Sequence, residues 1–100
     1  MIPVLKTLAT SDFIWTLVES HSECLVVETT YEDQNVRAMI DMEYIDGRSF
    51  NMNLQLTIDR TLLFSNRKSE KEEYSPEDRK QAAELAMKII TSMMKGQLVC

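Results

Sequence analysis

The chain has 100 residues, 44% of them hydrophobic and 27% charged, a composition typical of one folded domain that buries roughly 60–65% of its unfolded surface. Its net charge of −5 argues against direct binding to a phosphate backbone, which requires clustered Lys and Arg side chains. No apolar run reaches the roughly 20 residues of a membrane span, and no signal-peptide pattern is present. Because Cys24 and Cys100 also form no disulfide framework or metal motif, we expect a cytoplasmic protein.

Residues 12–20 carry signals for two different structures. Thr10 or Ser11 before Asp12 is typical of a helix start, and the apolar residues at 13, 14, 17 and 18 share one helical face. The same segment is rich in aromatic and β-branched residues, which favour strands. A sheet with one apolar face needs a cover, and helices supply one economically. We therefore predict a helix over 12–20, with a strand as the alternative.

Three runs in the middle of the chain alternate apolar and polar residues, the pattern of half-buried strands. They cover 25–31, 36–44 and 50–58, and "TLLFS" at 61–65 indicates a shorter fourth strand. We expect a loop over 45–49, because a two-residue turn would set polar residues of one strand opposite apolar residues of the next. The expected pairs are Val36 with Ile58, Ala38 with Leu56, Ile40 with Leu54, Met42 with Met52, and Tyr44 with Phe50.

The preceding hairpin is predicted by the same reasoning. A four-residue loop over "EDQN", residues 32–35, keeps apolar residues of the two strands on one face. The expected pairs are Tyr31 with Val36, Thr29 with Ala38, Val27 with Ile40, and Leu25 with Met42.

The stretch "SPEDRKQAAELAMKIITSMMKG", residues 75–96, predicts a long helix. Ser75 is the expected N-cap, Pro76 occupies the first helical position, and Gly96 ends the helix. The apolar arc of this helix spans roughly 200°, about twice what one buried face needs. Met87 and Met94 lie at the rim of the arc, so we expect them to meet something besides the sheet.

These elements predict a single α+β domain over residues 1–100. It is a two-layer sandwich, with an antiparallel meander of three to four strands covered on one face by the C-terminal helix and by an N-terminal helix. If residues 12–20 form a helix, they can cover the Met87 and Met94 rim. If they form a strand, the rim stays open, and we expect a homodimer that meets there.

No catalytic, cofactor or metal site is predicted. One histidine, His21, leaves no acid–base pair or triad to assemble, and no Gly-rich phosphate loop is present. Asp41 and Glu43 alternate outward on a strand and Asp46 follows it, an arrangement typical of solubilising carboxylates rather than of a divalent-ion site.

The outward face of the predicted sheet offers an amide-rich, mildly acidic surface that can bind a protein. Its candidate contact residues are Met39, Asp41, Glu43, Asn51, Asn53 and Gln55.

The sequence thus favours a small non-enzymatic protein-binding module, an adaptor or inhibitor that occupies a partner's surface. One alternative is an acidic inhibitor that competes with nucleic acid for a basic groove of an enzyme. This reading follows from the uneven charge, since residues 1–67 hold five basic and ten acidic side chains. The acidic residues in question are Glu28, Glu32, Asp33, Asp41, Glu43 and Asp46. A third reading is an enzyme of unrecognised type.

Overall fold

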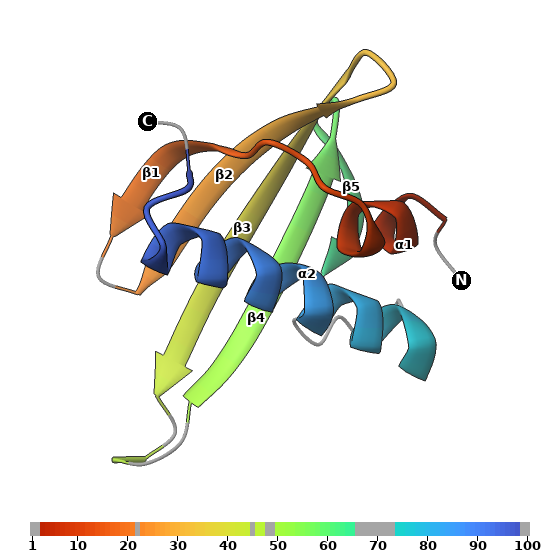
Figure 1. Ribbon diagram of the computed structural model, residues 1–100. Coiled ribbons are helices and arrows are strands. Elements are labelled where there is room, and N and C mark those ends of the chain that lie inside the picture. The colour runs from red at the N-terminus through yellow and green to blue at the C-terminus, as the bar shows by residue number, and fades with distance from the viewer. Residues whose placement is uncertain (1–2, 22, 45, 48–49, 66–73, 99–100) are drawn as a thin grey trace.

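The computed structural model describes residues 3–21, 23–44, 46–47, 50–65 and 74–98, with the backbone alone at 43–44 and 50–51. In chain order the elements are α1 (Pro3–Thr10), β1 (Thr16–His21), β2 (Cys24–Tyr31), β3 (Gln34–Tyr44), β4 (Phe50–Ile58), β5 (Thr61–Ser65) and α2 (Pro76–Met94). The strands form one antiparallel sheet in the order β1-β2-β3-β4-β5. Both helices lie on one face of that sheet, and α2 crosses β2, β3 and β4 (Figure 1).

This arrangement confirms the predicted α+β two-layer fold, with one strand more than expected. The additional strand is β1, which pairs with β2 and occupies the segment for which a helix was predicted. The helix prediction for 12–20 was therefore wrong. Aromatic and β-branched residues here favour an extended backbone, and the sheet edge offered by β2 supplies the hydrogen bonds that a short isolated helix lacks.

The N-terminal helix exists, but earlier in the chain, at Pro3–Thr10. Pro3 stands at its first position, where the missing N–H costs nothing. Leu5 and Leu8, one helical turn apart, are fully buried. This helix packs against α2 rather than lying flat across the sheet, as Figure 1 shows.

The predicted pairing of β3 with β4 is confirmed at each of its five expected pairs. Val36 pairs with Ile58, Ile40 with Leu54, and Tyr44 with Phe50. Ala38, Ile40, Leu54 and Leu56 of this ladder are buried beneath the helices. The register could be predicted because one face of the sheet is buried, and a slip by one residue would expose all apolar side chains of that face.

The pairing of β2 with β3 differs from the prediction by two residues. Leu25 pairs with Ile40 and Val27 with Ala38, because the strands join through a two-residue turn, Glu32-Asp33, instead of a four-residue loop. Both turn residues have positive φ, 48° and 64°. That conformation matches the twist of the flanking strands and makes the tightest hairpin. A shift of two keeps every side chain on its predicted face, so the hydrophobic pattern could not reveal it.

The last helix has the predicted ends. The Ser75 hydroxyl accepts a hydrogen bond from the backbone N–H of Asp78, and Pro76 is the first helical residue. At the other end Gly96 has a φ of 68° and donates to the Met93 carbonyl, while Gln97 donates to the Ser92 carbonyl. These two bonds form a Schellman ending, which satisfies carbonyls that the helix leaves open.

The core lies between the sheet and α2. Ala82, Ala86 and Ile89 face the sheet from α2 and are at most 2% exposed. The two alanines let the helix approach the strands closely, and Ala38 and Leu56 of the sheet are fully buried in the same core. Trp15 and Phe64 complete the same cluster from the segment before β1 and from β5.

Candidate protein-binding surface

One edge of α2 carries apolar side chains that the described part of the chain leaves exposed. We call it the methionine edge and define it as Ala83, Met87, Ile90 and Met94. Met87 is 50% exposed, Met94 is 79% exposed, Ala83 is exposed and Ile90 is half-buried. The four residues are spaced by four, three and four positions, which aligns them along one side of a helix.

The other side of α2 is occupied. The Lys88 ammonium donates to the Ser11 carbonyl and lies 3.4 Å from the Asp12 carboxylate. These contacts tie α2 to the segment between α1 and β1, and α1 packs next to it. Because residues 16–21 form a strand and not a helix, the chain segment proposed to cover Met87 and Met94 lies elsewhere. The described residues therefore leave Met87 and Met94 exposed, as predicted for a strand in this segment.

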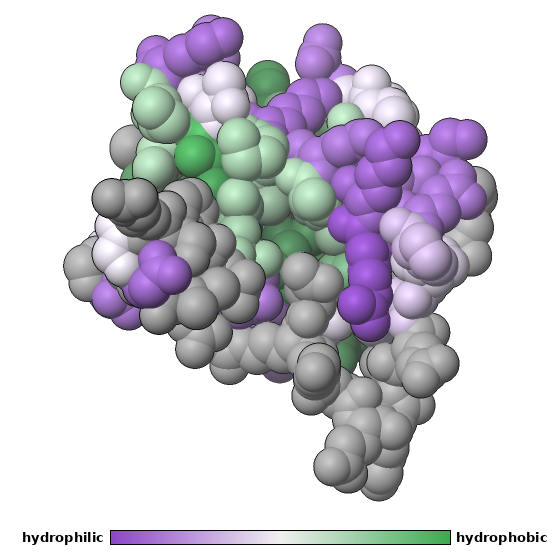
Figure 2. Space-filling view, turned by 90° about the horizontal axis from the view of Figure 1, so that it is seen from below, coloured by the Kyte–Doolittle hydropathy of each residue, from purple (hydrophilic) through white to green (hydrophobic). Residues whose placement is uncertain are grey.

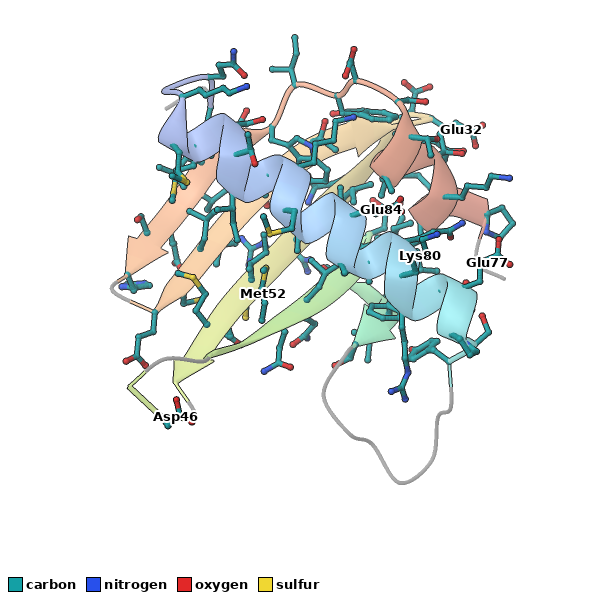
Figure 3. All side chains as sticks on the ribbon, turned by 60° about the horizontal axis from the view of Figure 1, so that its bottom comes forward. Glu32, Asp46, Met52, Glu77, Lys80 and Glu84 are labelled. Carbon is teal, nitrogen blue, oxygen red and sulfur yellow. The ribbon has the colours of Figure 1, made fainter. Side chains whose placement is uncertain are left out.

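The sheet also carries methionines on the face that α2 covers. Met42 and Met52 are cross-strand partners on the helix-covered face and both are half-buried. Figure 3 shows Met52 beside α2, where β3 and β4 run past the helix. Figure 2 shows pale-green apolar surface in the middle and left of this side of the molecule, bordered on the right by purple hydrophilic side chains. Flexible thioether side chains suit such a surface, because they adapt to partners of irregular shape.

Other exposed apolar side chains are dispersed. Val18, at 40% exposure, lies in the edge strand β1, and Ile14, at 77%, just precedes that strand. Leu62, at 46%, lies in β5 at the opposite sheet edge. Single exposed apolar residues are normal on a protein surface, whereas a contiguous group is informative. The methionine edge is such a group, with Met93 adding a further 37%-exposed thioether on the same helix.

The predicted outer-face residues lie on the other side of the sheet. Met39 pairs with Gln55 and Asp41 with Asn53 across the β3–β4 ladder, and all four are half-buried. Glu43 and Asn51 are backbone partners in the same ladder, and their side chains lie outside the described part of the structure. The fold thus brings the predicted β3 and β4 residues together, but separates them from Met87 and Met94 by the thickness of the sheet.

Val26 is a residue on the outer face that the sequence analysis left out of the candidate set. It is 2% exposed although the helices lie on the other face, and it is flanked by Glu19 and Met39 in the neighbouring strands. The signal was its place in the apolar run "CLVV", which alternation alone assigns to both faces. The outer face is consequently less polar than its amide residues indicate.

The acidic residues of the nucleic-acid-competitor alternative are spread along the sheet. The Glu28 carboxylate accepts a hydrogen bond from Arg37 at 3.2 Å and from Asn35 at 3.4 Å. Glu32 and Asp33 form the turn before β3, and Asp46 follows the far end of that strand (Figure 3). Eleven residues of strand separate these ends by about 36 Å.

The described residues include no group of three His, Cys, Asp or Glu side chains close enough to hold a metal ion. His21 lies 3.7 Å from the Glu19 carboxylate on the exposed edge strand β1. Neither described helix is long and apolar enough to cross a membrane.

Comparison with protein-family models, with curated proteins and with solved structures finds no match to this chain.

Proposed function

We propose that this protein is a non-enzymatic protein-binding module, an adaptor or inhibitor that acts by covering a partner's surface with its methionine edge. The observation that carries the proposal is the exposure of Met87 and Met94 on a helix whose sheet-facing side is buried in the core. Burial of such side chains gains about 25 cal/mol per Å² of apolar surface. Because they are exposed in the folded chain, this free energy can stabilise a complex with a partner.

The composition of the edge supports recognition of an apolar partner. Methionine is enriched in the centres of protein interfaces, where Lys and Glu are depleted. Met42 and Met52, half-buried on the sheet face that α2 covers, add two further thioethers to the same layer of the molecule. A cytoplasmic location forms part of the proposal, and a chain with two cysteines and no disulfide framework is compatible with a reducing compartment.

The test compares the wild type with the double variant Met87→Glu/Met94→Glu, both immobilised and exposed to a lysate of the source cells. The captured proteins are quantified by mass spectrometry, and the strongest is purified for calorimetry. We expect the double variant to bind that partner at least about tenfold more weakly, because charges placed in a desolvated apolar contact cost more than 1.4 kcal/mol.

The matched control is Ile14→Glu/Leu62→Glu. It adds the same charge at sites of nearly equal exposure, 77% and 46% against 79% and 50%, but away from the methionine edge. Binding by the control should equal that of the wild type. Affinity that falls steeply with added salt in all three proteins would instead support the nucleic-acid competitor, whose contacts are charged. Equal capture by both double variants would refute the methionine edge as the contact.

A further inference from the structure

We infer that the methionine edge is self-complementary and that its occupant is a second copy of this chain, paired through α2 in antiparallel orientation. The inference rests on the proposed function and specifies the partner of the same surface. Two properties of the described helix carry it, namely the order of large and small residues along the edge and the distribution of charge beside it.

The order of side-chain sizes fits an antiparallel pair. From Lys80 onward, the edge residues recur at alternating spacings of three and four, as in a helix seam that packs against another helix. With a two-fold axis beside Met87, the small Ala83 of one copy faces the branched Ile90 of the other. Met94 then faces the aliphatic stem of Lys80, and the two Met87 side chains meet at the axis. Small against large at each level is the condition for close packing.

A parallel pair lacks this fit. It would place Ala83 against Ala83 and Ile90 against Ile90, with a gap at one level and crowding at the other. It would also place Glu84 beside Glu84 and align the two helix dipoles.

The charges beside the edge favour the same orientation. Glu77, in the first turn of α2, would lie near Lys95, just past the last turn of the other copy. Each acidic N-terminal end therefore meets one basic C-terminal end, and the two-fold axis gives the dimer two such contacts. Figure 3 shows Glu77, Lys80 and Glu84 in succession along α2.

The area of the edge sets the strength of the pair. From Lys80 to Met94 the edge is about 21 Å long and one helix about 10 Å wide, so it offers on the order of 200 Å². A standard interface buries about 800 Å² per partner, so the pair belongs to the weak, concentration-dependent class even with the contribution of Met42 and Met52. Each copy also carries a charge of −5, so added salt should strengthen the pairing by screening their repulsion.

The experiment is sedimentation velocity of the full chain from low micromolar to high micromolar concentration, at low and at high salt. We expect the wild type to sediment progressively faster as its concentration rises, and more so at high salt. Met87→Glu/Met94→Glu should raise the dissociation constant at least about tenfold relative to Ile14→Glu/Leu62→Glu, which has the same net charge. A wild type that stays monomeric, or equal weakening by both double variants, would overturn the inference.

The orientation is tested by charge reversal. Glu77→Lys and Lys95→Glu should each weaken the dimer several-fold, and the two together should restore it, because the reversed charges again meet across the two-fold axis. Circular dichroism at each step confirms that the variants remain helical. A double reversal as weak as the single ones would overturn the antiparallel pairing. A monomeric wild type whose capture of another protein still depends on Met87 and Met94 would overturn the second copy as occupant while leaving the proposed function in place.

Discussion

The helix start at Ser75 allows a sharp prediction for Ser75→Ala. The Ser75 hydroxyl makes two hydrogen bonds with one residue, accepting from the Asp78 backbone N–H at 3.1 Å and donating to the Asp78 carboxylate at 2.7 Å. Asp78 is only 3% exposed, so water cannot replace the hydroxyl once it is removed. The substitution therefore deletes a helix cap and also a hydrogen bond to a buried carboxylate.

The expected loss of stability exceeds that of an ordinary cap. Removing an N-cap hydroxyl costs about 1 kcal/mol, and a hydrogen bond to a charged group contributes about 1.5–3 kcal/mol. We expect Ser75→Ala to lower the free energy of unfolding by about 2–4 kcal/mol, a large fraction of the roughly 5–15 kcal/mol of a typical domain. The melting temperature should fall by about 4–8 °C per kcal/mol.

The assay is urea denaturation followed by the fluorescence of Trp15, the only tryptophan of the chain and 4% exposed in the folded state. Ser75→Thr is the control, because threonine keeps a hydroxyl that can make both bonds. A loss below about 0.5 kcal/mol for Ser75→Ala would refute the double role of the hydroxyl.

Two further predictions concern the sheet. Val27→Asp should abolish folding, because Val27 is fully buried on the helix-covered face, whereas Thr30→Asp on the same strand should change stability by less than about 0.5 kcal/mol. Thermal melting followed by circular dichroism checks the assigned faces, and similar melting of the two variants would contradict them. Arg60→Gly should raise the melting temperature by a few degrees, because Arg60 has a φ of 69° in the tight β4–β5 turn and glycine adopts that conformation without strain. An unchanged or lower melting temperature in calorimetry would disprove this prediction.

The register of β3 and β4 was open to prediction from the sequence, whereas that of β2 and β3 was not. In the first case the apolar sets of the two strands align in only one way that keeps a single face buried. In the second case two registers, differing by two residues, bury the same face. The choice depended on the ability of Glu32 and Asp33 to adopt positive φ, which neither residue signals as strongly as glycine would.

The segment 12–20 shows the limit of periodicity more clearly. Its apolar residues fit a helical face, yet it forms the edge strand β1. The outcome depended on β2, whose free edge offers β1 a hydrogen-bonding partner, and on α1, which supplies the N-terminal helix earlier in the chain. No local signal in the segment itself reports either neighbour.

The candidate surface, too, could be predicted in part from the sequence and in part only from the structure. The sequence by itself determined that α2 carries more apolar arc than one sheet can cover, because helical spacing places Met87 and Met94 at the rim whatever the rest of the chain does. Only the tertiary structure showed that the described residues leave Met87 and Met94 exposed and that Met42 and Met52 lie on the sheet face that α2 covers. The physical reason is that exposure is a property of neighbours distant in the sequence. An apolar pattern predicts which residues gain free energy on burial, but the packing of the other elements determines which of them are buried.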